Sequence, residues 1–236
     1  KVPFYKQRYT LLKKIIIKSA LTTLGVVAGC AVFVFAVLSL GFPGTLCGWC
    51  EQLGNYGFAV KYASLYYSYT GDVVDLARCA DDSILAENDG YIIEYCTQLV
   101  DDEGFAQYCT VRDKEINDGI SGDENFGGIT FSYRHYIYGA VSAAEYRAGE
   151  SDLAIGYAIS SLNAGFDRTS FSAQTYSEKI EGFPVNNALG SLSLRVIENK
   201  DKTTGGKILK VLEGVSPDGD DEGMYLATLM VALGGL

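Results

Sequence analysis

The sequence has few of the residues that metal sites and active sites use most often. The 236-residue chain contains one histidine, one tryptophan, two methionines and four prolines. A zinc site needs four converging ligands, and the single histidine, His135, lies far in sequence from the cysteines. No nucleophile elbow, complete phosphate loop or complete calcium loop is present. We therefore expect no metal, no cofactor and no enzymatic activity, and a surface position on a helix for His135.

Charged residues are absent between Lys18 and Glu51. Within that stretch, the apolar run from Ser19 to Leu40 has the length that a helix needs to cross the ~30 Å hydrocarbon core of a bilayer. A cleaved signal peptide has a shorter apolar core, and the segment Val27–Cys30, which resembles a bacterial lipoprotein box, continues into apolar sequence instead of a polar tether. The pattern predicts a permanent membrane-spanning helix.

Acidic residues are absent from the N-terminal end, where six basic residues lie within the first 18 positions. The positive-inside rule therefore predicts a cytoplasmic N-terminus and a C-terminal domain in the periplasm or at the cell surface. We expect Lys13, Lys14 and Lys18 at the cytoplasmic membrane interface and the amphipathic ring of Trp49 at the outer one. The protein is thus predicted to be a single-pass membrane protein in contact with membrane lipid.

Basic residues are scarce in the remainder of the chain. Positions 19–236 hold 13 basic and 29 acidic residues, a net charge of −16. Such a domain repels nucleic acid, so we expect no nucleic acid partner. Other protein subunits are the partners that we expect, and a peptide or glycan ligand is an open alternative.

The low proline content and the many alanines, leucines and tyrosines favour helices over a β-sandwich. Apolar residues recur at helical spacing, as at Phe58, Tyr62, Leu65 and Tyr69. We predict an all-α fold, with one transmembrane helix followed by an ectodomain of helical hairpins. The predicted segments are a cytoplasmic basic segment (1–18), the transmembrane helix (19–41), a juxtamembrane linker (42–54), disulfide-stapled hairpins (55–114), a loop (115–129) and a second helical region (130–236).

The segment 142–162 resembles the middle of a tetratricopeptide repeat. That motif has a glycine at the turn between its helices, an alanine five residues later and a leucine further along the second helix; Gly149, Ala154 and Leu162 match it. The motif also has a tyrosine four residues before the glycine; Tyr67 stands in that position before Gly71, whereas Glu145 stands there before Gly149. The resemblance implies helix pairs stacked into a curved surface that holds a peptide or a partner subunit.

Cysteine is absent after Cys109, and five of the six cysteines follow the apolar run. An extracytoplasmic position would favour disulfides among them. Cys96 and Cys109 lie at equal distances on either side of the turn at 101–104, so a hairpin would bring them to the same height on facing helices. We predict a Cys96–Cys109 disulfide and a second one between Cys79 and either Cys47 or Cys50.

Cys47 and Cys50 also form a Cys-Gly-Trp-Cys motif. Such a pair at a helix N-terminus can have one depressed thiol pKa and carry out thiol exchange. The surrounding sequence has no preceding strand and no βαβ pattern, so the pattern favours a structural role for these cysteines.

Three functional hypotheses follow from the sequence. The favoured one is a structural or adaptor subunit of a membrane or cell-envelope assembly. The second is a membrane-tethered thiol-disulfide oxidoreductase that uses Cys47 and Cys50. The third is a peptide or glycan receptor with an open groove lined by tyrosines.

Overall fold

The computed structural model describes residues 4–120, 132–163, 188–216 and 220–236. Every regular element in these ranges is a helix, which confirms the prediction of an all-α fold. The eleven described helices are α1 (Phe4–Gly41), α2 (Pro43–Gln52), α3 (Tyr56–Thr70), α4 (Val73–Leu85), α5 (Asp89–Val100), α6 (Phe105–Ile120), α7 (Tyr133–Ala148), α8 (Ser151–Asn163), α9 (Ala188–Glu198), α10 (Lys202–Leu212) and α11 (Asp220–Gly234).

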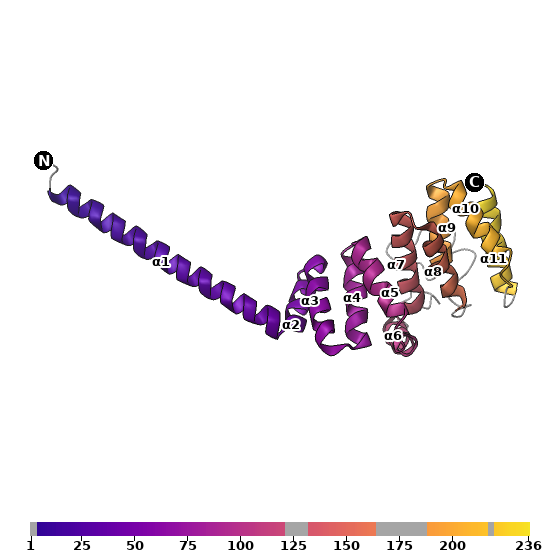
Figure 1. Ribbon diagram of the computed structural model, residues 1–236, viewed down its shortest axis with the longest axis horizontal. Coiled ribbons are helices and arrows are strands. Elements are labelled where there is room, and N and C mark those ends of the chain that lie inside the picture. The colour runs from indigo at the N-terminus through magenta and orange to yellow at the C-terminus, as the bar shows by residue number, and fades with distance from the viewer. Residues whose placement is uncertain (1–3, 121–131, 164–187, 217–219) are drawn as a thin grey trace.

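Helix α1 projects as a rod from one end of a stack formed by the other helices (Figure 1). Within its segment Lys13–Gly41, an 18-residue stretch has a mean hydropathy of 2.4, and none of that stretch is buried against the rest of the chain. By length and composition it is the one described helix that could cross a membrane, and a signal sequence near an N-terminus satisfies the same criteria. Lys13, Lys14 and Lys18 are exposed along this helix.

Helix α2 occupies the segment that the sequence indicated as a linker. Phe42 has a non-helical backbone that separates α1 from α2. Pro43 then begins α2, because its fixed φ suits the first position of a helix and its missing N–H leaves no lost hydrogen bond there. The ring of Tyr66 on α3 packs beside Gly44, so α2 is attached to the stack.

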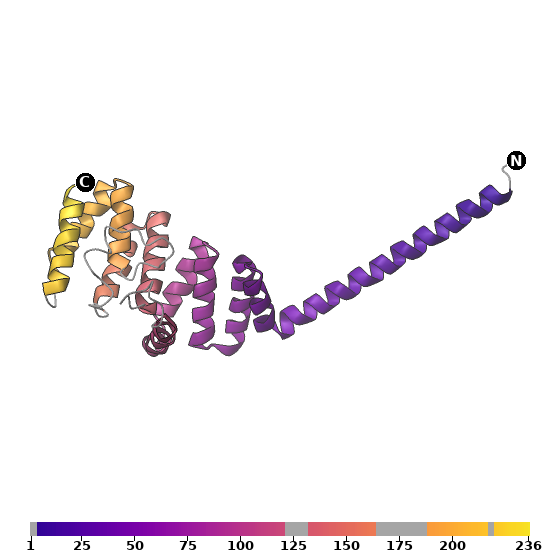
Figure 2. The same cartoon turned by 180° about the vertical axis from the view of Figure 1, so that it is seen from behind.

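Helices α2 to α11 form an elongated array with the C-terminus at the end opposite α1 (Figures 1 and 2). Contacts run from α2 to α3, α3 to α4, α4 to α5 and α5 to α7, and from α7 to α8 and α9. Helices α10 and α11 complete the array against α9. Each helix therefore contacts mainly its neighbours in the chain, as in a repeat protein.

Two glycines end helices at the turns that carry the tetratricopeptide-like pattern. Gly71 ends α3 with φ +64°, and its N–H donates to the carbonyl of Tyr67. Gly149 ends α7 with φ +91°. Both are left-handed conformations that glycine adopts without a Cβ clash. Asp72 then caps α4 by accepting a hydrogen bond from the Val74 N–H.

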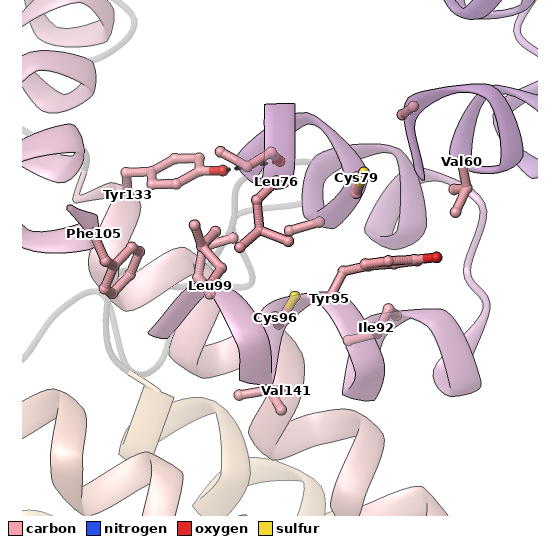
Figure 3. Packing of buried hydrophobic residues seen from close by; sticks show 14 of the residues in the cluster. Val60, Leu76, Cys79, Ile92, Tyr95, Cys96, Leu99, Phe105, Tyr133 and Val141 are labelled. Atoms are coloured by element: carbon pink, nitrogen blue, oxygen red, sulfur yellow. Dashed lines mark hydrogen bonds between the residues drawn. The ribbon is translucent and has the colours of Figure 1, made fainter. Parts of the chain in front are cut away.

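The buried apolar residues form two clusters. One joins α2 to α7 and includes Leu76, Leu99 and Val141 (Figure 3). The other joins α8 to α11 and includes Leu192 and Leu229. Tyr138 on α7 packs against both clusters, so the two halves share one continuous interior.

The predicted disulfides are not present, because all six cysteines are free thiols. The prediction assumed that α5 and α6 fold back on each other. Instead α5 packs between α4 and α7, while α6 lies nearly end-on beneath α7 in Figures 1 and 2. Cys96 therefore lies in the core formed with Leu76 and Leu99 (Figure 3), where burial raises the pKa of its thiol. Neither Cys79 nor Cys109 has a disulfide partner.

His135 differs from the expectation of a surface position, since only 4% of its surface is exposed. Its Nδ1 forms a hydrogen bond with the Oγ of Ser161, which is itself fully buried. The pair joins α7 to α8, so this histidine serves the helix packing.

Candidate functional site

A groove of about 630 Å³ opens between α4, α5, α7 and α9. It combines small, apolar and charged side chains from segments far apart in the sequence. Its lining consists of Ile84, Glu87, Asp89, Ile92, Tyr136, Gly139, Ala140, Ala143, Arg147, Ser191 and Arg195.

Helix α7 supplies one continuous side of the groove. Tyr136, Ala140, Ala143 and Arg147 follow one another at intervals of three or four residues, so they lie on the same face of the helix. Gly139 lies beside this stripe, where the helix approaches the backbone of Ala188 on α9. The small residues leave space between Tyr136 at one end and the guanidinium of Arg147 at the other.

Two arginines and two acidic residues, Glu87 and Asp89, line the groove. The Arg147 Nε donates hydrogen bonds to both carboxylate oxygens of Asp89, at 2.9 and 3.0 Å. These hydrogen bonds hold the pKa of the Asp89 carboxyl below its usual range. Arg195, on α9, has no described carboxylate within ion-pairing distance. Its pKa is lowered, mainly because the guanidinium is buried and also because the positive charge of Arg147 lies nearby.

This arrangement suits a carboxylate next to an apolar side chain. Arg147 and Arg195 both reach the groove, and of the two only Arg147 forms a close ion pair with a described carboxylate, while Glu198 and Asp89 act on Arg195 through their charge. A bound carboxylate could therefore pair with Arg195 without displacing Asp89. Ile84 and Ile92 supply apolar surface beside it.

The groove differs from the tyrosine-lined surface considered for a receptor. Tyr136 is its one tyrosine. Tyr95 and Tyr133 are buried, and their hydroxyls satisfy internal partners. The Tyr95 hydroxyl donates to Ser64 Oγ at 2.9 Å, and the Tyr133 hydroxyl donates to Asp81 Oδ1 at 2.8 Å.

The Cys-Gly-Trp-Cys motif lies within α2, with Cys47 buried and Cys50 half-buried. Burial raises the pKa of both thiols, and the carboxylates of Asp82 and Glu51 raise them further. Thiol exchange needs a depressed thiol pKa, so this environment is the reverse of the one required. Trp49, between the two cysteines, is exposed near the end of the apolar rod.

Cys47 instead belongs to a polar cluster between α2 and α4. Its Sγ lies 3.4 Å from Glu51 Oε1 and 3.5 Å from Asp82 Oδ2. Arg78 donates to both oxygens of Glu51, from Nε at 2.6 Å and from a terminal nitrogen at 2.7 Å. These hydrogen bonds hold the Glu51 pKa below its usual range, whereas burial raises the pKa of Asp82 to about 7.

The remaining residues singled out in the sequence are structural. Gly71 and Gly149 form turns, and Tyr67 packs against the first core cluster. Ala154 is fully buried in the second cluster. Leu162 lies in α8.

The groove residues were missed because they come from four helices. The spacing of Tyr136, Ala140, Ala143 and Arg147 was the one local signal, and it is also typical of an ordinary packing face. The pairing of Arg147 with Asp89 joins residues 58 positions apart, which no local pattern indicates.

Comparison with known proteins gives a distant similarity to a class of helical-repeat proteins. A pentatricopeptide repeat-containing protein of Arabidopsis thaliana is 30% identical over 96 residues, which are 40% of this chain and 14% of that protein. A mitochondrial pentatricopeptide repeat-containing protein of the same plant is 29% identical over 133 residues, which are 56% of this chain and 20% of that protein. The matched regions thus cover a fifth or less of these relatives. No family model and no solved structure matches the chain. The similarity and the all-helical fold together support a helical-repeat architecture.

Proposed function

We propose that this protein is a membrane-anchored helical-repeat adaptor, which holds a partner protein against the outer face of a membrane. The observation that carries the proposal is the joining of an exposed apolar helix, α1, to an array of stacked helices. An exposed helix with an 18-residue stretch of mean hydropathy 2.4 is unfavourable in water and favourable in a bilayer. The helical array supplies an extended surface for a partner.

The charge distribution supports an N-terminus in the cytoplasm. All charges of the first 18 residues are positive, and the first acidic residue of the chain is Glu51. Under the positive-inside rule, the helical array then lies in the periplasm or at the cell surface. Reporter fusions at each end of the chain test this orientation, and a C-terminal reporter that is active in the cytoplasm would contradict it.

The groove between α4, α5, α7 and α9 is the proposed contact for the partner. Its proposed occupant is an extended segment of a protein that carries an acidic side chain beside an apolar one. Charge complementarity supports this choice, because Arg195 forms no close ion pair with a described carboxylate, although the charges of Glu198 and Asp89 act on it. The small side chains of Ala140 and Ala143 leave room for the apolar group.

Helical-repeat proteins can also read RNA, one base per repeat. The net charge of −16 over residues 19–236 opposes the approach of a polyanion, so we favour a protein partner. RNA that binds tightly at physiological salt, and more weakly as salt rises, would reverse this preference.

A peptide array probed with the detergent-solubilised chain tests the groove. We expect binding to peptides with an acidic residue next to an apolar residue, and loss of binding when Asp or Glu is replaced by the amide. Arg195→Glu removes the cation, and Ala140→Phe fills the space, so each variant should weaken binding at least ~10-fold. The matched control is Lys202→Glu, a charge reversal at an exposed position of α10. Equal binding by the Arg195 and Lys202 variants would refute the groove as the contact.

A further inference from the structure

Four polar side chains meet where the membrane-proximal helix contacts the array. Cys47 and Glu51 lie one turn apart on α2, and Arg78 and Asp82 lie one turn apart on α4. Cys47 is fully buried and Asp82 is 3% exposed. The two pairs face each other, because Cys47 contacts Asp82 and Glu51 contacts Arg78.

The cluster has the spacing of a set of metal ligands. One ligand atom each from Cys47, Glu51 and Asp82 lies within 4.8 Å of the other two. A tetrahedral zinc ion, with a Zn–S bond of about 2.3 Å and Zn–O bonds of about 2.0 Å, places sulfur and oxygen ligands about 3.5 Å apart. The observed separations from the sulfur to the two carboxylate oxygens are 3.4 and 3.5 Å.

With both carboxylates ionised, the cluster lacks one positive charge. Two carboxylates, Glu51 and Asp82, share one guanidinium, that of Arg78. The described hydrogen-bond partners of the buried Asp82 carboxyl are the thiol of Cys47, at 3.5 Å, and the carboxyl of Glu51, and neither is a cation. A buried carboxyl group is normally protonated, paired with a cation or bound to a metal, and a metal ion here would have the Cys47 sulfur and the Glu51 and Asp82 carboxylates as donors within reach.

We propose that Cys47, Glu51 and Asp82 bind one Zn²⁺ ion. The divalent ion, the Cys47 thiolate, the two carboxylates and the Arg78 guanidinium then sum to zero charge. Binding displaces the thiol proton of Cys47 to solvent. Arg78 acts as the outer partner that fixes the orientation of the Glu51 ligand.

The ligand set favours zinc over other common cations. Calcium and magnesium prefer oxygen ligands alone, whereas a thiolate with carboxylates suits a borderline-soft ion. Three protein ligands leave a fourth position for water. The ion would join α2, which follows α1 directly, to α4, and would thus stiffen the attachment of the apolar helix to the array.

Cobalt titration of the full-length, detergent-solubilised and reduced chain tests the site. We expect a thiolate-to-cobalt charge-transfer band that saturates at one equivalent and that Zn²⁺ abolishes. Cys47→Ser should remove the band. Asp82→Asn, which preserves the side-chain shape, should weaken cobalt binding at least ~10-fold and should abolish the rise in melting temperature that Zn²⁺ causes in the unaltered chain.

Cys50→Ser is the matched control, since Cys50 lies three residues from Cys47 on the same helix and is outside the set of mutually close ligands. This variant should keep the band. Absence of the band in the unaltered chain would overturn the proposal, as would its survival in Cys47→Ser or its loss in Cys50→Ser. If the Cys47→Ser variant does not fold, as judged by the loss of its helical circular dichroism, two other measurements decide the question. These are the cobalt absorption band of the unaltered chain and the cobalt affinity of the Asp82→Asn variant.

Discussion

Removal of the Tyr133 hydroxyl should destabilise the first core cluster by an amount that depends on pH. Tyr133 is 2% exposed, and its hydroxyl donates to Asp81 Oδ1 at 2.8 Å. In Tyr133→Phe the carboxylate loses this donor inside the protein. A hydrogen bond to a charged group contributes about 1.5–3 kcal/mol, so we expect a loss of this size in the free energy of unfolding at about pH 8.

The sign of the pH dependence follows from the pKa of Asp81. Burial raises this pKa to about 6, and the hydrogen bond from Tyr133 opposes the rise. The variant should therefore have an even higher Asp81 pKa in the folded state. The loss begins to grow at about pH 6, where Asp81 of the unaltered chain ionises, and it is complete above the higher pKa that Asp81 has in the variant. Below that pH the carboxyl is protonated, and we expect only the ~0.5–1.5 kcal/mol of a neutral hydrogen bond.

Urea unfolding followed by circular dichroism measures both values, with a chelator present so that bound metal makes no contribution. Tyr108→Phe is the matched control. Tyr108 packs edge-to-face on Tyr133 at 5.4 Å between ring centroids, and its hydroxyl has no hydrogen bond to a described residue. We expect a change within about 0.5 kcal/mol for this variant. An equal loss at both pH values in Tyr133→Phe, or no loss at either, would refute the reasoning.

Three further predictions concern the turns, a cap and the groove. Gly149→Ala should lower the free energy of unfolding by about 1–2 kcal/mol, because the backbone φ at this position is +91°. The same change at Gly156, which lies inside α8 and faces open space, should raise the free energy of unfolding by up to ~1 kcal/mol. Thermal unfolding compares the two variants, and a change of the same sign in both would contradict the argument. Asp201→Ala should destabilise by about 0.5–2 kcal/mol, because Asp201 caps α10 by accepting from an N–H of the first turn; urea unfolding measures this, and Asp201→Asn should lose much less. Arg147→Ala should lower stability by less than ~1 kcal/mol at neutral pH, since the ion pair is partly exposed. The paired Asp89 has a lowered pKa, so the ion pair stabilises the fold above the unfolded-state pKa of about 3.9, and this stabilisation disappears as the pH falls through the folded-state pKa. The unfolding curves of the Arg147→Ala variant and the unaltered chain should therefore converge in acid.

The elements that the sequence predicted correctly are those with local signals. The helical spacing from Phe58 to Tyr69 predicted α3, and the glycines at 71 and 149 mark the ends of α3 and α7. In these cases the residues that define the structure lie within a few positions of one another. The apolar run is likewise contained in one helix, α1.

The errors arose where distant helices determine the environment. The Cys96–Cys109 disulfide required α6 to fold back on α5, but the chain packs α5 against α7, which begins at Tyr133. The burial of His135 depends on Ser161, 26 residues away. Each outcome depends on which helices become neighbours, and helical periodicity does not determine that choice.

Helix α2 was missed for a different reason. Proline and glycine at its start indicate a linker when read alone, although proline is favourable at the first helical position. With α2 read as a linker, the one-turn spacing of Cys47 and Glu51 was not considered. The pairing with Arg78 and Asp82 then adds residues more than 25 positions away.

The central claim, that the chain is an anchored adaptor, is tested most directly by its state after gentle extraction from its native membrane. We predict that the chain remains in the membrane fraction after a carbonate wash. In mild detergent it should then migrate as a complex with a partner protein in a fixed molar ratio, and Arg195→Glu should release that partner while Lys202→Glu retains it. A chain that is washed from the membrane, or that purifies alone as a monomer with the mass of 25.5 kDa, would contradict the account.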